Sequence, residues 1–426
     1  MIRRLFIANR GEIALRVLRT AHRLGMTTIL AVSEADRDSL PARLADETRP
    51  VASYLSIEAL IDAAVAAGAD AIHPGYGFLS ENAAFARVAS EAGIVFVGPE
   101  PATLAAMGDK LEARRIAQAA GLPVVPGREG GFPLLIKAVA GGGGKGMKRV
   151  DREEELDAAM AMAAAEAEAA FGDGRLYVER FIASGRHVEV QVLGDGTRAV
   201  HLGDRDCSIQ RRFQKLVEEA PAPFIPDDKR AALRNAAVRL AEHLHYRGAG
   251  TVEFLVDAAD FDFYFLEMNA RIQVEHPVTE AVTGIDLVEQ QLLIAGGEPL
   301  GVRQETIALE GHAIEARINA EDGRRDFRPS PGTVRRAAWP AGPGIRVDSH
   351  IADGGKVPPL YDSLIGKLIV SGSDRAEAVA RLRSALDALE IEGVETTAGL
   401  HRAIAADPRF VQGGVDTRFF EGFGNA

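Results

Sequence analysis

An alternation of polar and apolar residues near the middle of the chain constrains the fold more than any other feature. Between residues 267 and 275 the even positions are Met, Ala, Ile and Val, whereas the odd positions are all polar. This period of two predicts a strand with two unlike faces. The run 261–266 directly before it is too apolar for an exposed edge. We therefore expect the polar face to line a cleft inside the protein.

A second predicted strand, 251–256, precedes the first, and turn-forming residues between them favour a hairpin. If the hairpin is symmetric about residue 260, positions that sum to 520 face each other, and Glu253 lies opposite Glu267. Opposed carboxylates with Cβ atoms roughly 5 Å apart repel unless a cation or a proton separates them. Because no Cys or paired His is near, Mg²⁺ or Mn²⁺ is expected before zinc. The alternative is a surface hairpin with two solvated glutamates.

The composition limits the class of protein. A chain of 426 residues is expected to form two to four packed domains. Its net charge of -12 argues against nucleic acid or an anionic membrane as the main partner, but allows a local basic site for an anionic substrate. The single cysteine, Cys207, excludes an internal disulfide and is expected to pack rather than react. Since no signal peptide or apolar run of roughly 20 residues occurs, we expect a cytoplasmic enzyme.

The N-terminal part has the pattern of a parallel α/β unit. Predicted strands at 3–9 and 28–32 flank a predicted helix, and a further strand is expected at 69–72. The first loop, Asn9-Arg10-Gly11-Glu12, lacks the G-x-G-x-x-G of dinucleotide sites, which predicts Rossmann-like topology without NAD. The loop 73–78 follows the carboxyl end of a strand, where open α/β sheets bind ligands.

A glycine run at 141–144 is the clearest phosphate-binding signal. It lies between predicted strands at 133–139 and 147–150. Glycines let backbone N–H groups approach phosphate oxygens, and Lys145 adds charge. The run is not a Walker A loop, because Gly146 replaces the required Ser or Thr. A hairpin lid over a nucleotide fits better than a flexible linker, since Lys137 inside an apolar strand calls for an anionic partner.

Further strands at 176–182, 187–192 and 198–202 predict that an antiparallel sheet follows the parallel one. His187 in one of them is expected, on local sequence, to be a half-buried strand histidine. The segment 203–215 is dense in basic groups, so that Lys215 either helps to bind an anion or belongs to a solvated basic loop.

Two other basic residues each allow a functional and a purely structural interpretation. Lys110 lies at a break in the helical pattern 101–120, where it either points into a cleft or is solvated at the surface. Arg346 alternates onto one face with Asp348 and His350, which allows a structural ion pair as well as a catalytic role.

Taken together, the glycine-rich hairpin, the opposed carboxylates and the polar strand resemble an ATP-grasp fold, and longer motifs resemble the biotin carboxylase family almost from end to end. The motifs that carry this resemblance are Ile7-Ala8-Asn9-Arg10-Gly11-Glu12-Ile13-Ala14, His73-Pro74-Gly75-Tyr76-Gly77-Phe78-Leu79-Ser80-Glu81-Asn82, 141–147, 267–276 and Tyr361-Asp362-Ser363-Leu364-Ile365-Gly366-Lys367. The resemblance implies a mixed α/β and α+β architecture. Its expected parts are a Rossmann-like parallel-sheet domain at 1–121, a mobile glycine-rich lid at 122–182, an ATP-grasp catalytic subdomain at 183–310 and a mixed C-terminal domain at 311–426.

The resemblance also implies a role for individual residues. The expected ATP-binding residues are Lys110, Lys137, Gly141, Gly142, Gly143, Gly144, Lys145, Gly146, Met147, Glu179, Ile182, His187 and Gln210. The expected ligands of Mg²⁺ or Mn²⁺ are Glu253, Glu267 and Asn269. Bicarbonate is expected at Lys215, Arg271, Gln273 and Val274, with Glu275 as the general base. Biotin is expected at Tyr76 and Arg346, and the catalytic set is Glu275, Arg271, Lys215 and Arg346, the last stabilising the biotin enolate.

The activity that the resemblance implies is ATP-dependent carboxylation of biotin by bicarbonate through carboxyphosphate. The expected setting is the first half-reaction of acetyl-CoA carboxylase or a related acyl-CoA carboxylase, in fatty acid synthesis. Because no Met-Lys-Met sequence occurs, biotin is expected on a carrier protein or a separate domain, with a carboxyltransferase as the further partner and a homodimer as the assembly. The stop at Ala426 resembles a free-standing bacterial subunit, and a fragment of a larger carboxylase is the alternative. Two other functions stay open: another ATP-grasp carboxylate–amine ligase, and a nucleotide-binding scaffold without turnover.

Three departures from the family pattern stand out. Phe213 replaces the usual His, which puts one nucleotide contact in question. The segment 45–53 is short, and 127–131 lacks the helix that normally separates two strands at the start of the lid. If the lid is shortened in this way, its motion and the activity are expected to suffer.

Overall fold

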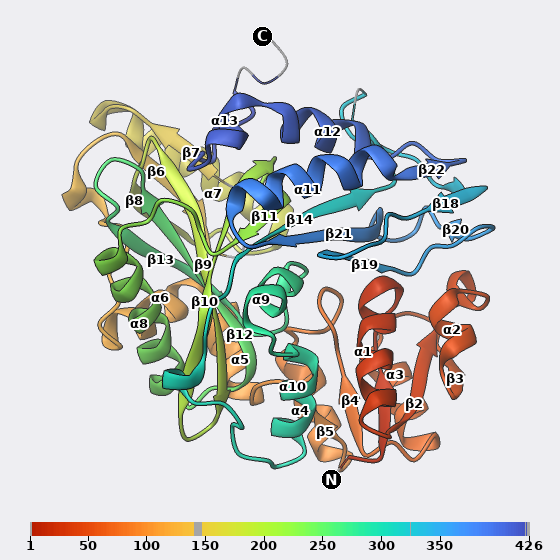
Figure 1. The fold of residues 1–426 in the computed structure, drawn as a ribbon. Helices are drawn as coiled ribbons and strands as arrows, with labels where there is room; N and C mark the ends of the chain where they lie inside the picture. The colour runs from red at the N-terminus through yellow and green to blue at the C-terminus, as the bar shows by residue number, and fades with distance from the viewer. Residues whose placement is uncertain (1, 140–146, 324, 422, 424–426) are drawn as a thin grey trace.

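The computed structural model describes residues 2–139, 147–323, 325–421 and 423 (Figure 1). A five-stranded parallel sheet in the order β3-β2-β1-β4-β5 forms the N-terminal domain. Its strands are β1 (Arg4–Ile7), β2 (Thr27–Val32), β3 (Glu47–Pro50), β4 (Ala71–His73) and β5 (Val95–Phe96). Its helices are α1 (Gly11–Arg23), α2 (Leu40–Leu44), α3 (Ile57–Ala66) and α4 (Ala83–Glu91), with a 3₁₀ turn η1 at Glu34–Asp36. The predicted parallel α/β unit is confirmed, and β3 at its edge was not predicted.

The helical pattern 101–120 forms two helices, α5 (Pro101–Gly108) and α6 (Lys110–Ala119). The break comes at Asp109, whose carboxylate caps the second helix by accepting hydrogen bonds from the backbone N–H groups of Leu111 and Glu112. This break places Lys110 at the first position of α6, on the wall of the central cavity described below.

A three-stranded antiparallel sheet, in the order β7-β6-β8, follows as a separate layer. Its strands are β6 (Leu134–Ala138), β7 (Met147–Val150) and β8 (Leu176–Arg180), covered by α7 (Leu156–Phe171) after the turn η3 (Glu153–Glu155). Strands β6 and β7 pair as a hairpin should, whereas the glycine run between them lies outside the described residues. Ahead of β6, a single 3₁₀ turn, η2 (Arg128–Gly130), occupies the place of the helix missing from the sequence.

An eight-stranded antiparallel sheet joins the centre of the chain to its C-terminal part, in the order β13-β12-β9-β10-β11-β14-β21-β19. The strands are β9 (Gly185–Asp195), β10 (Ala199–Arg211), β11 (Gln214–Ala220), β12 (Arg247–Asp257), β13 (Phe263–Asn269), β14 (His312–Asn319), β19 (Ile345–Ser349) and β21 (Leu364–Gly372). In Figure 1 this sheet runs from the green strands to the blue ones, and α1 of the N-terminal domain packs against β19 and β21. The predicted change from a parallel to an antiparallel sheet is therefore confirmed.

Helices pack against this sheet and against one another. They are α8 (Asp227–His243), α9 (His276–Thr283), α10 (Leu287–Ala295), α11 (Arg375–Ala388), α12 (Ala398–Ala406) and α13 (Pro408–Gln412), with a turn η4 at Gln304–Thr306. Short pairs complete the C-terminal part: β15 (Glu321–Asp322) with β16 (Arg328–Pro329), β17 (Gly332–Thr333) with β20 (Lys356–Val357), and β18 (Arg336–Ala338) with β22 (Glu390–Glu392).

One sequence-based expectation was wrong in detail, and one of the alternatives left open by the sequence does not hold. The polar alternation at 267–275 is a strand only as far as Asn269, and the residues after it run irregularly into α9. The basic segment 203–215 is not a solvated loop, because β10 continues to Arg211 and β11 starts at Gln214. Only Arg212 and Phe213 form the turn, both with positive φ angles of 52° and 63°.

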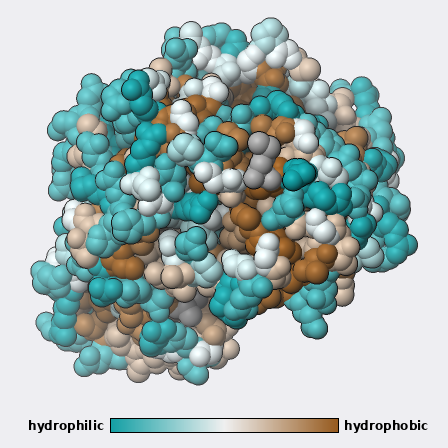
Figure 2. Space-filling view, turned by 90° about the horizontal axis from the view of Figure 1, so that it is seen from below, coloured by the Kyte–Doolittle hydropathy of each residue, from teal (hydrophilic) through white to brown (hydrophobic). Residues whose placement is uncertain are grey.

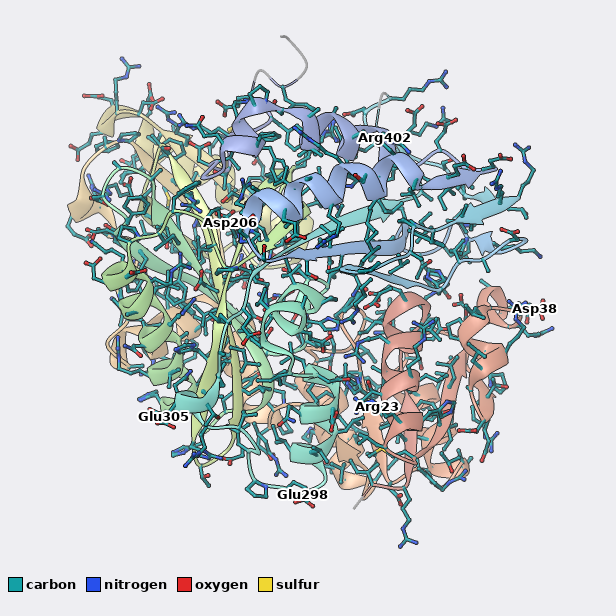
Figure 3. The ribbon with its side chains drawn as sticks, viewed as in Figure 1. Arg23, Asp38, Asp206, Glu298, Glu305 and Arg402 are labelled. Atoms are coloured by element: carbon teal, nitrogen blue, oxygen red, sulfur yellow. The ribbon has the colours of Figure 1, made fainter. Side chains whose placement is uncertain are left out.

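Charged side chains cover the outside of the molecule and apolar ones fill several cores. Figure 3 shows Asp38, Glu298 and Glu305 at the periphery, whereas Asp206 lies inside, where it pairs with Arg186 at 2.6 Å. The face shown in Figure 2 is mostly hydrophilic, with separate hydrophobic patches. Among the described residues, none of the helices combines the length and the apolar character needed to cross a membrane.

Candidate active site

A cavity of about 1310 Å³ lies where the three parts of the molecule meet, bounded by the loops after β1 and β4, the lid strands, and strands β9 to β14. Most of the residues that the sequence analysis singled out line this cavity. They are Tyr76, Lys110, Lys137, Met147, Glu179, Ile182, His187, Gln210, Lys215, Glu253, Glu267, Asn269, Arg271, Gln273 and Val274. The glycine run 141–144, Lys145 and Gly146 lie outside the described residues.

The two opposed glutamates lie in the predicted register, because Glu253 on β12 is the direct partner of Glu267 on β13. Burial and the charge of Glu253 raise the pKa of Glu267. Burial also opposes ionisation of Glu253, but the positive charges of Lys215 and His187 outweigh it and lower its pKa. The cations beside Glu253 therefore offset its burial, whereas the cations near Glu267 do not. A divalent cation between the two carboxylates would relieve their repulsion.

The ammonium group of Lys215 is the centre of positive charge in the cavity. Its Nζ lies 2.6 Å from Glu189, 2.9 Å from Glu253 and 2.7 Å from Glu275. Burial opposes its charge, but the three carboxylates outweigh burial and raise the pKa of Lys215 well above its usual value. The lysine therefore stays a cation, and its three N–H donors are taken by these carboxylates, so an anionic substrate would have to replace one of them.

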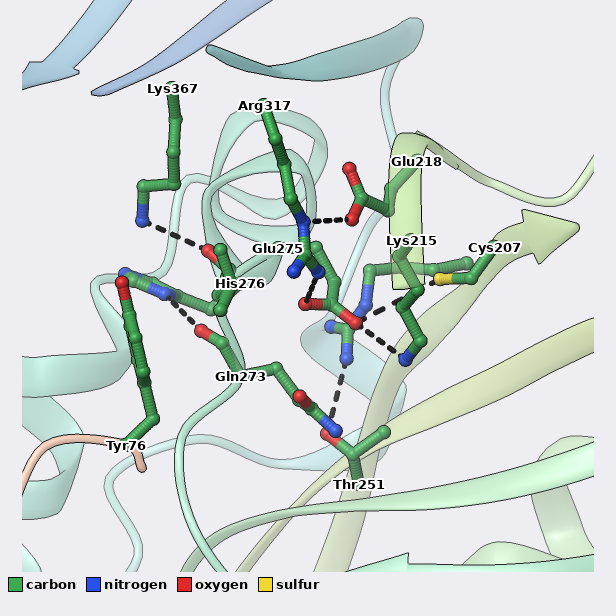
Figure 4. Close-up of polar contacts among 12 residues, drawn as sticks. Tyr76, Cys207, Lys215, Glu218, Thr251, Gln273, Glu275, His276, Arg317 and Lys367 are labelled. Atoms are coloured by element: carbon green, nitrogen blue, oxygen red, sulfur yellow. Dashed lines mark hydrogen bonds and ion pairs between the residues drawn. The ribbon is translucent and has the colours of Figure 1, made fainter. Parts of the chain in front are cut away.

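Glu275 lies directly behind the cavity wall and is fully buried, at 0% exposure. Its Oε1 accepts a hydrogen bond from Lys215 at 2.7 Å, and its Oε2 accepts one from Nη2 of Arg317 at 2.8 Å (Figure 4). Burial opposes its ionisation, but Lys215, Arg317 and Arg205 lower its pKa well below the usual value. Glu275 is consequently an anion that can accept a proton.

The irregular segment that carries Arg271, Gln273 and Glu275 is fixed by its neighbours. The Nε of Arg271 donates to Glu81 at 2.9 Å, and Nδ1 of His276 lies 2.7 Å from the carbonyl of Gln273. Lys367 on β21 donates to the carbonyl oxygen of Val274 at 2.9 Å (Figure 4). These contacts come from three parts of the chain, so the segment is held in place without being part of a sheet.

Asn269 is already bound to its neighbours. Its Nδ2 donates to Oε1 of Glu253 at 2.8 Å, and its Oδ1 accepts from Arg271 at 3.0 Å. Both polar ends of the amide are occupied within the chain. A role for Asn269 as a metal ligand requires its Oδ1 to leave Arg271 and stays a prediction.

On the three-stranded sheet, two cations share one buried carboxylate. Lys137 and Arg114 both pair with Glu179, whose side chain is 5% exposed. His187 does more than fill the half-buried position that its local sequence predicted, because its Nε2 lies 3.0 Å from Glu253 and its Nδ1 2.9 Å from Nε2 of Gln210. Burial lowers the pKa of His187, but Glu253 outweighs burial and raises it.

Arg346 requires a correction. Its guanidinium is not among the cavity-lining groups and pairs with Glu280 and Asp348, each at 2.7 Å, as the structural alternative predicted. The sequence analysis missed Arg317 on β14, which lines the cavity and contacts Glu275. The available signal was that Glu315 and Arg317 alternate with apolar residues in the strand His312–Asn319, because a buried charge needs a partner.

Tyr76 lies where a biotin-binding residue was expected, on the cavity wall, and its hydroxyl donates to Oε1 of Glu12. Cys207 is buried, with its Sγ 3.9 Å from Oε1 of Glu275. Burial raises the pKa of its thiol well above the usual value. The expectation that this cysteine packs rather than reacts agrees with that environment.

Comparison with known proteins covers nearly the whole chain. Residues 1–104 match the biotin carboxylase N-terminal domain, 105–303 the carbamoyl-phosphate synthase L chain ATP-binding domain, and 315–422 the biotin carboxylase C-terminal domain. The chain is 50% identical to biotin carboxylase of Nostoc sp. (98% of each chain covered) and 49% identical to biotin carboxylase of Pseudomonas aeruginosa (99% and 98%). It is 45% identical to a pyruvate carboxylase subunit of Methanothermobacter thermautotrophicus (99% and 90%).

Solved structures agree. A Campylobacter jejuni biotin carboxylase in complex with β,γ-ATP superposes with a TM-score of 0.95 at 45% identity, covering 99% of both chains. The biotin carboxylase domain dimer of Hydrogenobacter thermophilus 2-oxoglutarate carboxylase, with MgADP, ADP and bicarbonate, gives 0.94 at 45% identity (99% and 97%). The chain therefore belongs to the biotin carboxylase family of ATP-grasp ligases, enzymes that use ATP to carboxylate biotin.

Proposed function

We propose that this chain carboxylates carrier-bound biotin with bicarbonate and ATP through carboxyphosphate, and that Glu275 is the base. The observation that carries the proposal is the buried Glu275 carboxylate, held ionised between Lys215 and Arg317 beside the cavity. An isolated anion in that position would be costly, so the two cations hold Glu275 in the ionised form that a general base needs.

Nucleotide binding is assigned to the cavity walls between the lid and the large sheet. The residues assigned there are Lys110, Lys137, Met147, Glu179, Ile182, His187 and Gln210. Lys145 and the glycines of 141–146, outside the described residues, are assigned to ATP on the family resemblance alone. Glu253 and Glu267, with Asn269, would hold Mg²⁺ or Mn²⁺, and the raised pKa of Glu267 fits that assignment. The bound cation would neutralise phosphate charge during transfer.

Bicarbonate is assigned to Lys215, Arg271, Gln273 and Val274, which line the cavity in front of the buried Glu275. Glu275 accepts the bicarbonate proton, and the oxygen so activated attacks the γ-phosphorus of ATP. A bond from this oxygen to phosphorus forms, the bond to the β–γ bridging oxygen breaks, and ADP leaves with that electron pair. Lys215 and Arg271 lie where they can stabilise the charge on the carboxyphosphate product.

The second half of the reaction needs a cation for the biotin enolate. Carboxyphosphate splits into CO₂ and phosphate, the phosphate takes the ureido N–H proton, and the ring nitrogen attacks CO₂. Arg317 is better placed than Arg346 for the enolate oxygen, because Arg317 lines the cavity and Arg346 does not. Tyr76, on the same cavity, is assigned to the biotin ring.

We further propose that the chain works in acetyl-CoA carboxylase, in the cytoplasm, as a homodimer with a biotin carboxyl carrier protein and a carboxyltransferase. The support is the higher identity to biotin carboxylases, at 50% and 49%, than to the pyruvate carboxylase relative, at 45%. Formation of malonyl-CoA when the chain is combined with its carrier and an acetyl-CoA-specific carboxyltransferase tests this assignment. Carboxylation of pyruvate or 2-oxoglutarate, when the chain is combined with the carboxyltransferase for that acid, would assign the chain to a different carboxylase.

Bicarbonate-dependent ATP hydrolysis with Mg²⁺, measured with and without free biotin, tests the chemistry. We expect biotin to stimulate turnover in the wild type and turnover to collapse in Glu275→Gln. The matched control is Glu242→Gln on the exposed side of α8, which should behave as the wild type. Turnover that ignores biotin would indicate another ATP-grasp ligase, and ATP binding without turnover would indicate a scaffold.

A further inference from the structure

Two buried carboxylates have no part in the reaction proposed above. Glu218 lies on β11 and Glu315 on β14, and the two residues are direct partners in the antiparallel register. Both are 0% exposed, and neither lines the cavity. Directly opposed residues of such a pair have Cβ atoms about 5 Å apart, so two ionised carboxylates here would repel strongly in a medium without water.

The hydrogen bonds of this pair are incomplete. Oε1 of Glu218 accepts from Nε of Arg317 at 2.6 Å (Figure 4). Oε2 of Glu218 and both carboxylate oxygens of Glu315 are buried without a hydrogen-bond partner. Three orphan oxygens on two opposed side chains are unusual, because buried polar atoms are nearly always paired.

The cations that face Glu315 are engaged with other groups. Arg317 pairs with Glu218 and Glu275, and Lys367 pairs with Glu12 at 3.1 Å and donates to the carbonyl of Val274. In the described part of the chain, no ion pair within 4.0 Å involves Glu315, and the remaining neighbouring charges, Glu218 and Glu275, are negative. An ionised Glu315 would therefore be an uncompensated buried charge.

We propose that Glu315 is a neutral carboxylic acid in the folded chain, that it donates its proton to Oε2 of Glu218, and that this pair positions Arg317 against Glu275. A carboxylic acid kept neutral by an apolar site can serve as a hydrogen-bond donor at neutral pH. One such bond supplies a partner to both Oε2 of Glu218 and one oxygen of Glu315. Glu218 then remains an anion, as its bond to the guanidinium requires.

The directions in which the pKa values of the two carboxyl groups are shifted agree with this arrangement. Burial raises the pKa of Glu315 well above its usual value, and the opposing charge of Lys367 does not compensate. Burial likewise raises the pKa of Glu218, to about 7, against the opposing charge of Arg317. Such coupled carboxyl groups titrate as a pair, so the proposal assigns one proton to Glu218 and Glu315 together.

The consequence for catalysis rests on the proposed function. Arg317 is bound at both ends of its guanidinium, through Nε to Glu218 and through Nη2 to Glu275. When Glu315 fixes Glu218, Glu218 in turn fixes the plane of the Arg317 guanidinium, and this guanidinium orients the carboxylate of Glu275. Glu218 and Glu315 are positioning residues, since they act through Arg317 and touch no substrate.

The decisive test reads the proton directly and needs no turnover. Infrared spectra of the full-length wild type and of Glu315→Gln are compared at pH 8, in the carbonyl region where protonated carboxylic acids absorb. We expect the wild type to show one acid band that is missing from the variant. If the two spectra match in that region, Glu315 is ionised and the proposal is overturned, whatever the chain catalyses.

Kinetics test the positioning role. A glutamine is neutral and carries a donor, so Glu315→Gln should keep kcat close to that of the wild type. Glu315→Leu removes the donor and should lower kcat by up to about 100-fold while KM for ATP stays constant. A folded Glu315→Gln with the kcat of Glu315→Leu would show that the charge of Glu315 matters and would overturn the proposal. Absence of turnover even in the wild type would refute the proposed function, and the infrared result would still decide the state of Glu315.

Discussion

Removing the ammonium group of Lys367 should destabilise the C-terminal part of the molecule. Lys367 has a fully buried side chain on β21, 3.1 Å from the carboxylate of Glu12 on α1, itself 2% exposed. Lys367→Met keeps the apolar stem and deletes the charge. The variant leaves Glu12 in the interior with the hydrogen bond from Tyr76 but without its cation.

The magnitude follows from burial. Removing one partner of a buried ion pair leaves an uncompensated charge, which costs about 3–5 kcal/mol of unfolding free energy. Neutralising the second partner as well should recover much of this loss, because replacing both members of a buried pair is often nearly neutral. We therefore expect Lys367→Met with Glu12→Gln to be more stable than Lys367→Met alone, with a coupling of about 2–3 kcal/mol.

The single tryptophan makes the measurement local. Trp339 packs on β21 beside Gly366, where an added Cβ would lie 2.6 Å from its ring, and its Nε1 donates to the carbonyl of Ile351 at 3.2 Å. Its fluorescence during urea unfolding reports on the part of the chain that contains Lys367. Lys356→Met, at an exposed lysine of the same domain, is the control and should stay within about 0.5 kcal/mol of the wild type.

Two outcomes would refute this reasoning. The first is a Lys367→Met variant as stable as the Lys356→Met control. The second is a double variant whose loss equals the sum of the two single losses within about 0.5 kcal/mol, because independent sites are additive and an ion pair is not.

Three further predictions concern the site and the core. Arg317→Met should lower kcat by about 100-fold or more, whereas Arg346→Met should change stability but not kcat. A larger loss of kcat in Arg346→Met than in Arg317→Met would show that Arg346 is the catalytic arginine. Iodoacetamide at pH 8 should leave Cys207 unmodified in the folded chain and modify it in urea, because burial raises the pKa of the thiol, and mass spectrometry decides. Burial lowers the pKa of His401 to about 4, so its neutral form stabilises the fold above pH 6.5 and that contribution is lost as the pH falls towards 4. Between these limits the wild type should lose up to about 1.4 kcal/mol per pH unit relative to His401→Gln, and parallel urea midpoints for the two proteins would contradict this.

The sequence predicted the site best where charge and strand periodicity coincide. The register of the hairpin is correct through Glu253 and Glu267, because two carboxylates on facing strands leave a visible pattern in one dimension. Lys137 in an apolar strand predicted a buried anionic partner in the same way, and Glu179 is that partner. The order of a parallel sheet and then an antiparallel one followed from the helical and strand periods along the chain, whereas the ATP-grasp fold class was implied by the family resemblance.

The prediction failed where residues distant in sequence supply the contacts. Polar alternation continued to Glu275 although β13 ends at Asn269, because side chains can alternate towards a cavity without sheet pairing. Arg317 was missed for a similar reason: its partners, Glu218 and Glu275, are distant in sequence, and no local motif marks the three as neighbours. The same holds for Lys367, which reaches Val274 from another part of the chain.

The hairpin that carries the opposed glutamates also contains a bulge. Glu253 pairs with Glu267, but the next pair is Phe254 with Phe265, so Leu266 is the extra residue on β13. The extra residue shifts the alternation by one position: Phe265 and Met268 are buried in the core, whereas Leu266, Glu267 and Asn269 line the cavity. One strand thereby presents an apolar side chain and a carboxylate side by side to the same cavity. Deleting Leu266 would leave the length of the hairpin almost unchanged, yet would exchange the faces of everything before it on the strand.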